Sequence, residues 1–270
     1  MRFALISDVH FGEPVLHEGK LRKLTHQAEP LVEDFVARMQ NEHRPELVVN
    51  LGDVIEDENR ELDLARYGRF VELVERAAPR TLHVAGNHDQ AYLSDDDLRK
   101  LWRHDGPLHY STDHGGFHFA VLRTIEYTNV AIRLPEEQIA WLEADLAATR
   151  LPSIVLMHHP ASEMVLDGNR WFEARPHVCR VAERRKVRSV IEAAGNVIAV
   201  FNGHVHWNHC DFIRGIPYFT LQSLIENVDD DAPGRAAAAF AVCDVDAHRL
   251  SVNVYGVEPV RYQVELAPRA

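Results

Sequence analysis

The chain has 270 residues, of which 46% are hydrophobic and 26% are charged, and its formal net charge at pH 7 is −12. This composition is typical of a folded globular protein, and the acidic balance argues against nucleic acid or an anionic membrane as a partner. No apolar run approaches the roughly 18 residues of a membrane-spanning helix. Cys179, Cys210 and Cys243 are widely spaced and form no CxxC pair, which favours reduced thiols in a cytoplasmic protein.

Strands and helices are predicted to alternate in the first half of the chain. Apolar, β-branched runs predict strands over 3–6, 47–51 and 81–84. Apolar residues at helical spacing predict helices over 20–41, where Pro30 begins or kinks the second part, and over 62–77. Ser94 before an acidic turn predicts a short helix over 95–103. Such alternation is typical of a parallel sheet.

The second half mixes hairpins with further strand–helix units. Gly115 and Gly116 form the predicted turn of a hairpin made by 108–111 and 117–122. Helices are predicted over 135–148 and 180–194. Further strands are predicted over 154–157, 197–201, 210–213, 218–221, 238–245 and 250–255, with the alanine run at 236–239 interpreted as strand.

No repeat and no low-complexity linker divides the sequence. We therefore expect one domain over residues 1–270. The poorly patterned segment 161–178 is the candidate for a cap or for a contact between subunits of a homo-oligomer.

Polar side chains follow five of the predicted strands. The run 47–51 leads into Gly52 and Asp53, and open α/β sheets place their chemistry at such carboxyl ends of strands. The donors are carboxylates, imidazoles and an amide, a set that suits Mn, Fe, Co or Zn rather than a thiolate-bound structural zinc. A pair of metals also relieves the repulsion between converging carboxylates. The other four strand ends carry Asp8 and His10; Asn87, His88 and Asp89; His158 and His159; and His204 and His206.

This ordered series resembles the calcineurin-like metallophosphoesterase superfamily, and the resemblance covers residues 3 to about 222. It implies an α/β fold, a four-layer α/β/β/α sandwich of two mixed sheets flanked by helices, with the metal site at the strand C-termini. It also implies two divalent or mixed-valence metal ions (Mn, Fe, Zn or Co). The matching blocks are Asp8-x-His10, Gly52-Asp53, Gly86-Asn87-His88-Asp89, His158 and Gly203-His204-x-His206.

The resemblance also implies a role for each matching residue. The first metal would be held by Asp8, His10 and His206, and the second by Asn87, His158 and His204, with Asp53 bridging the two. His88 would face the phosphate or protonate the leaving oxygen, and Asn87 would lie beside it. Asp89 would orient the His88 imidazole, or would cap a helix. His159 would support a ligand or contact the substrate.

The implied reaction is hydrolysis of a phosphate ester by metal-bound hydroxide. No serine stands at a nucleophile elbow and no GxxxxGK[ST] loop is present, which disfavours a kinase or an NTP-driven motor. The layout of 203–209 and 212–217 is similar to class III cyclic-nucleotide phosphodiesterases and to glycerophosphodiesterases, and it favours a small diester. A phosphomonoesterase and a non-catalytic metal-binding scaffold remain alternatives, and a polynucleotide nuclease is disfavoured by the acidic charge.

Specificity is expected in the loops 11–19, 56–61, 89–94, 161–178 and 206–209. Trp171, Phe172 and Trp207 are candidates to stack on a base or cover an apolar leaving group. Arg170 and Arg175 are candidates to bind a second phosphate or a carboxylate. Packing of a cap or of a dimer contact is the simpler interpretation for each of these five residues.

Overall fold

Two six-stranded mixed sheets form the centre of the protein. The structure is a computed structural model, and it describes residues 1–266. The first sheet has the order β14 (Val260–Glu265), β13 (Arg249–Tyr255), β12 (Phe240–Val245), β1 (Arg2–Ile6), β2 (Leu47–Asn50), β3 (Thr81–His83). The second has the order β10 (His209–Ile213), β11 (Ile216–Thr220), β9 (Val197–Asn202), β8 (Ser153–Leu156), β5 (Phe117–Val121), β4 (Tyr110–His114). A separate hairpin pairs β6 (Ile125–Tyr127) with β7 (Ala131–Arg133).

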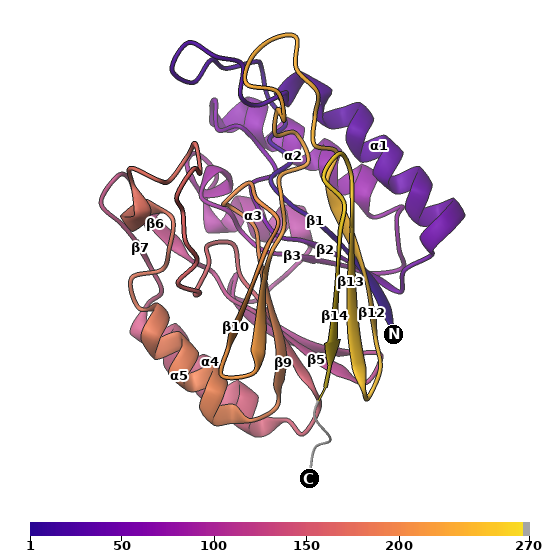
Figure 1. The fold of residues 1–270 in the computed structure, drawn as a ribbon, viewed down its shortest axis with the longest axis vertical. Helices are drawn as coiled ribbons and strands as arrows, with labels where there is room; N and C mark the ends of the chain where they lie inside the picture. Colours follow the sequence, from indigo (N-terminus) through magenta and orange to yellow (C-terminus); the bar gives the residue numbers. More distant parts are fainter. Residues whose placement is uncertain (267–270) are drawn as a thin grey trace.

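Helices cover the outer face of each sheet (Figure 1). The helices α1 (Ala28–Arg38), α2 (Arg60–Val74) and α3 (Asp95–Trp102) share one apolar cluster with the first sheet. The helices α4 (Glu136–Ala148) and α5 (Arg184–Ala194) share another with the second sheet. Short 3₁₀ turns and one π turn complete the helical segments, at Thr25–Gln27, Met39–His43, His88–Gln90 and Pro176–Val178.

The third and central apolar cluster lies between the two sheets. Alternate residues of β1 point to opposite faces, so Phe3 and Leu5 enter this cluster while Ala4 and Ile6 face the helices. The Phe3 ring meets Phe119 and Phe201 of the second sheet edge-on, at 5.9 and 5.8 Å between ring centroids. The predicted four-layer α/β/β/α sandwich is therefore confirmed.

Parallel pairing brings the site-bearing strand ends together. β1, β2 and β3 run parallel, with Ile6 opposite Asn50 and Asn50 opposite His83. In the second sheet β8 and β9 run parallel, with Leu156 opposite Phe201. The turns that follow these five strands consequently start at one end of the sandwich.

Several predicted boundaries are wrong, for local reasons. Residues 20–27 are not α-helical, because the backbone around Lys23 pairs with the segment at Glu226. The alanine run 236–239 is not a strand, because Ala238 has a φ of +50° and the N–H groups of this run bond to the 224–226 loop. The helix predicted over 180–194 begins at Arg184, and the hairpin β6–β7 and the strand β14 were not predicted.

All three cysteines are free thiols, as expected. Within residues 1–266 no helix combines the length and the apolar character needed to cross a bilayer. The expectation of one domain stays a prediction.

Candidate metal centre

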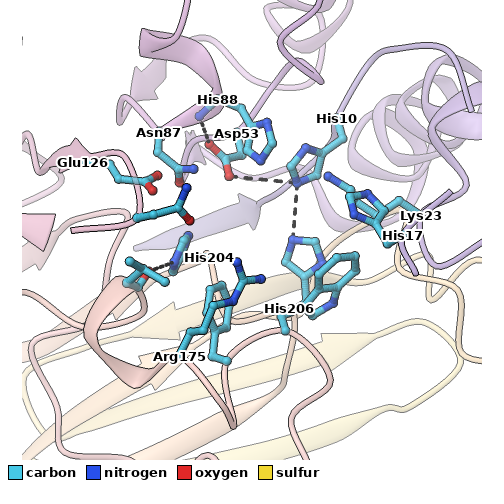
Figure 2. Close-up of a pocket in the computed structure, with 14 residues that line it drawn as sticks. His10, His17, Lys23, Asp53, Asn87, His88, Glu126, Arg175, His204 and His206 are labelled. Carbon is cyan, nitrogen blue, oxygen red and sulfur yellow. Dashed lines mark hydrogen bonds and ion pairs between the residues drawn. The ribbon is translucent and has the colours of Figure 1, made fainter. Parts of the chain in front are cut away.

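The turns after β1, β2, β3, β8 and β9 bring the predicted ligands into one buried cluster. Figure 2 shows those that line the cavity: His10, Asp53, Asn87, His204 and His206. Nitrogen or oxygen atoms of Asp8, His10 and His206 lie within 4.8 Å of one another. The same is true of Asp8, Asp53 and His158, so the groups share members. Asn87 joins through its Oδ1, 3.2 Å from His158 Nε2. All seven predicted ligands therefore meet at this end of the sandwich, with His204 grouped beside His158.

Two glycines allow this convergence. A Cβ at Gly86 would overlap the Asp53 carboxylate and backbone nitrogen, and a Cβ at Gly203 would press on Ser7 Oγ and the Asp8 carboxylate. Each glycine therefore marks a place where one ligand turn passes directly over a ligand from another strand.

The backbone of the ligand turns is held in an uncommon conformation. Left-handed φ values are unfavourable for residues that carry a Cβ, and they persist only where the surroundings impose them. Backbone hydrogen bonds between turns do so here, including Asp8 N to Gly52 O at 3.0 Å and His10 N to Asp53 O at 3.1 Å. Five of the predicted ligands have such values: Asp8 (+51°), His10 (+47°), Asp53 (+54°), His204 (+69°) and His206 (+57°).

The first half of the centre consists of Asp8, His10 and His206. His206 Nε2 lies 3.3 Å from His10 Nε2 and 3.5 Å from Asp8 Oδ1. The opposite nitrogens face carboxylates. His206 Nδ1–H donates to Glu226 Oε2 at 2.7 Å, and His10 Nδ1 lies 2.8 Å from Glu56 Oε2. The Nε2 atoms of both histidines therefore converge, while the Nδ1 atom on the far side of each ring faces a carboxylate.

The second half consists of Asn87, His158 and His204. His158 Nδ1–H donates to the Leu51 carbonyl at 2.8 Å, which leaves its Nε2 to face Asp53 and Asn87. His204 Nε2–H donates to the Val178 carbonyl at 3.0 Å, which leaves its Nδ1 to face the centre. These anchoring partners are neutral backbone oxygens.

A cation fits this arrangement. Because the opposite nitrogen of each histidine faces a carboxylate or a backbone oxygen, the converging nitrogen is the one that can offer a lone pair to a cation once it is unprotonated. The buried carboxylates that converge here need a positive charge, which a metal ion would supply. Burial alone would lower the pKa of His206 and of His158, but Asp8 and Glu226 in one case and Asp53 in the other outweigh it and raise both to about 9.

Asp53 is the predicted ligand that approaches both halves. Its Oδ2 lies 3.1 Å from His158 Nε2 and 4.0 Å from His10 Nε2. Its Oδ1 accepts the backbone N–H of His88 at 2.9 Å, which fixes the carboxylate plane. Burial acts to raise its pKa, but the charge of His158 outweighs this and keeps the pKa well below the usual value. Asp53 is therefore placed as a bridging ligand would be.

His88 lines the cavity, but its predicted partner is wrong. The His88 Nδ1 contacts Asp57, which follows β2, and not Asp89. Asp89 accepts three backbone N–H groups instead, from Asp53, Val54 and Gly86 at 2.8 to 3.0 Å. Through these three hydrogen bonds the buried Asp89 holds two ligand turns together.

The structure does not place two other predicted substrate contacts at the cavity. His159 is fully buried and its Nδ1 lies 2.7 Å from Thr124 Oγ1, so it supports the turn beside His158 and His204. Trp207 packs against the apolar cluster of Met164, Leu166, Cys179 and Val205 and is not among the cavity-lining residues.

The cavity extends to both sides of the ligands (Figure 2). We call one side the first arm, lined by His17, Lys23 and Trp171 next to His206. The other side, the second arm, is lined by Glu126 and Asn129 of the β6–β7 hairpin and by Phe172, whose ring centroid lies 4.6 Å from that of His204. Arg175 also lines the cavity, between His204 and His206 in Figure 2.

Sequence reasoning missed the residues that support the ligands and several that line the arms. These side chains lie in loops without a motif, and their partners are distant in sequence. A weak signal existed for Glu226, which follows the apolar residues Leu224 and Ile225 with no helical pattern. The missed residues are His17, Lys23, Glu56, Asp57, Glu126, Asn129 and Glu226.

Comparison with known families gives a match to the calcineurin-like phosphoesterase family over residues 1–208. The chain belongs to this family, and the predicted resemblance is confirmed. The coarse activity that membership supports is metal-dependent hydrolysis of a phosphoric ester. Comparison with curated protein sequences gives no match.

Solved structures share the fold. A dimetal phosphatase from Danio rerio superposes with a TM-score of 0.76 at 18% identity, covering 96% of this chain and 98% of that one. A purple acid phosphatase from yellow lupin (Lupinus luteus) seeds superposes with a TM-score of 0.67 at 13% identity, covering 98% of this chain and 53% of that one. At these identities the likeness shows the common architecture.

Proposed function

We propose that the protein is a binuclear metal phosphodiesterase that hydrolyses a small diester such as a cyclic nucleotide or a glycerophosphodiester. The observation that supports the diester is the two-armed cavity. A diester carries an organic group on each side of its phosphorus, and a cavity with one arm on each side of the ligands offers a place for both. Small substrates also suit the net charge of −12, which disfavours a polynucleotide.

The seven ligands divide between two metal ions in this proposal, with Mn, Fe, Zn or Co as the candidates. Asp8, His10 and His206 hold the first ion, Asn87, His158 and His204 hold the second, and Asp53 touches both. When bound, the ions supply Lewis-acid stabilisation of phosphoryl oxygens and a water of lowered pKa. The protein residues fix where these oxygens lie.

His88 is the proposed proton donor to the leaving oxygen. Burial acts to lower its pKa, but the charge of Asp53 and the contact with Asp57 outweigh this and raise the pKa, which favours the protonated imidazole. Its Nδ1 is engaged by Asp57, which leaves Nε2 to face the substrate. Donation of that proton prevents a free alkoxide from forming.

A panel of matched substrates tests the diester preference. The protein is stripped of metal, reloaded separately with Mn²⁺, Fe²⁺, Co²⁺ and Zn²⁺, and assayed on 3′,5′-cyclic AMP against 5′-AMP and on glycerophosphoethanolamine against glycerol 3-phosphate. We expect kcat/KM to be at least about tenfold higher for the diester of one pair. Faster turnover of the monoesters would contradict the proposal. No turnover with any metal would support the metal-binding scaffold.

A phosphomonoesterase is the second candidate, and Arg175 is the observation in its favour. Its side chain lines the cavity and makes no ion pair among residues 1–266, so it is available to the extra negative charge of a monoester. Arg175→Gln would then slow monoester turnover more than diester turnover, whereas equal effects would remove this support.

A further inference from the structure

Trp171 is joined to a predicted metal ligand through one buried carboxylate. Its indole Nε1–H donates to Glu226, at 3.1 Å from Oε1 and 3.2 Å from Oε2. Glu226 is 4% exposed and accepts the Nδ1–H of His206 at 2.7 Å. The chain Trp171–Glu226–His206 therefore runs from the cavity wall to the first half of the metal centre.

The segment that carries Trp171 is itself anchored next to His206. Asn169 is 1% exposed, and its Nδ2 donates to the carbonyl of Val205 at 3.0 Å. Its Oδ1 accepts the backbone N–H groups of Trp171 and Phe172 at 3.0 and 2.9 Å. Asn169 thus ties the backbone of Trp171 to the turn that carries His206, which fixes the position of the indole relative to that histidine.

The indole also packs beside the side chains that surround the first half. The Trp171 ring centroid lies 4.8 Å from that of His17 and 5.5 Å from that of His206, and the Lys23 ammonium lies 5.7 Å from the ring. Lys23 is 3% exposed and donates to Glu56 at 2.5 Å, and Glu56 in turn faces His10. Trp171 therefore contacts Glu226 directly, and it contacts Lys23, which binds the carboxylate that faces His10.

We propose that Trp171 is a positioning residue for the first metal site. Its N–H fixes the Glu226 carboxylate in the orientation that accepts the His206 Nδ1–H, and so directs His206 Nε2 at the metal. The inference rests on the proposed binuclear centre. It deepens that proposal because it assigns to the 161–178 segment a task in metal retention in addition to lining the cavity.

The effect should be confined to one half. His158 and His204 are oriented by the carbonyls of Leu51 and Val178, and among residues 1–266 the indole N–H of Trp171 donates to Glu226 and to neither carbonyl. Loss of a supporting hydrogen bond of this kind typically weakens metal binding by about 10–100-fold. The second site has no such bond to lose when Trp171 changes.

The test is a stepwise titration of the metal-free full-length protein with Mn²⁺, followed by calorimetry. Trp171→Phe removes the indole N–H and keeps an aromatic ring. We expect it to weaken one of the two binding steps by about tenfold or more and to leave the other within about twofold. Glu226→Gln, which keeps an oxygen near His206 but removes the charge, should weaken the same step.

Trp207→Phe is the matched control, because it makes the same chemical change next to His206 at a side chain that packs on the apolar cluster and does not line the cavity. It should leave both steps unchanged. Equal weakening of both steps by Trp171→Phe, or no change in either, would overturn the positioning role while leaving the binuclear centre intact. Failure of the unmodified protein to bind two metal ions would overturn the proposed function as well.

Discussion

The two halves of the metal centre hold their histidines in different ways. In the first half, side-chain carboxylates stand behind the imidazoles, Glu226 behind His206 and Glu56 behind His10. In the second half, the backbone carbonyls of Leu51 and Val178 do so. A carboxylate makes an imidazole a stronger donor than a neutral carbonyl does, and it can be altered by mutation or moved by its neighbours.

The contrast extends to the ligands. The first half contains the anionic Asp8, and the second contains the neutral amide of Asn87 at the corresponding place. The first half therefore concentrates more negative charge where an ion would bind, although Lys23 and Arg170 offset part of it through Glu56 and Glu226. We expect the first half to bind a given ion more tightly and to favour the ion of higher charge.

The largest effect should come from Asp53, which belongs to both halves. Asp53→Asn should weaken both metal-binding steps and reduce activity by at least about 10⁴-fold, because a bridging anion is lost. Asp8→Asn should weaken mainly one step. Metal content and stepwise titration distinguish the two variants. An Asp53→Asn protein that keeps one site at full affinity would show that Asp53 is not shared.

Replacing His88 should lower the rate of hydrolysis without weakening metal binding in either half. His88→Ala should retain both metals and lose about 10²–10⁴-fold in kcat, since only the proton donor is removed. Asp57→Asn should produce a smaller loss of the same kind, because it frees the imidazole that it orients. Metal analysis beside steady-state kinetics checks both variants. Loss of metal from His88→Ala would mean that His88 is a ligand.

Gly203→Ala should act on the first half before the second. The added methyl group would push on Ser7 and Asp8, and overpacking of this kind costs about 1–3 kcal/mol. We expect a lower melting temperature and weaker binding at the first site. Gly68→Ala in α2 is the control, because its new methyl group meets only Leu101 at 3.8 Å and should stabilise the helix by about 0.5–1 kcal/mol.

Metal affinity should also depend on pH. With the pKa of His206 and of His158 raised to about 9, each half of the metal-free protein holds one imidazolium at neutral pH. Burial lowers the pKa of His10 to about 4 and that of His204 to about 3, so these two rings are neutral. Each metal must therefore displace about one proton, and affinity should rise about tenfold per pH unit up to about pH 9.

Calorimetry in two buffers of different ionisation enthalpy measures this proton release. A binding affinity that stays constant between about pH 6 and pH 8 would contradict the assigned protonation. If the two metal-binding steps release unequal numbers of protons, the two halves differ in protonation as well as in their supporting groups. The difference would report how strongly Glu226 holds the His206 proton.

The sequence was sufficient for the ligand turns and insufficient for what surrounds them. Asp8, Asp53, Asn87 and His158 lie in the short turns after apolar strands, and strand order places such turns at one edge. Glu226 and Asp57 contact the site from loops whose path depends on the packing of distant segments. The role that the resemblance implies for Asp89 is wrong because the short 3₁₀ turn at His88–Gln90 directs Asp89 inward toward three backbone N–H groups.

The prediction of strands and helices succeeded where the local pattern was strong and failed where distant segments decide the structure. Continuous apolar runs predicted β1, β2 and β8, whereas apolar residues at helical spacing predicted a helix that includes 20–27, where the backbone pairs with the Glu226 segment instead. The β6–β7 hairpin, which supplies Glu126 and Asn129 to the cavity, has short strands and an Asn turn in place of a glycine turn. Such a hairpin gives little signal in local composition.

The left-handed backbone of the five ligand residues has a thermodynamic consequence. Without a cation, the turns are held against their own preference and against the repulsion of buried charges, so the metal-free fold should be the less stable form. A metal at about one hundred times its dissociation constant would add roughly 2.7 kcal/mol. For a chain of this size that corresponds to a rise of roughly 5–10 °C in melting temperature. A simple melting curve, recorded before and after chelation, would thus serve as a gauge of how fully a preparation is loaded.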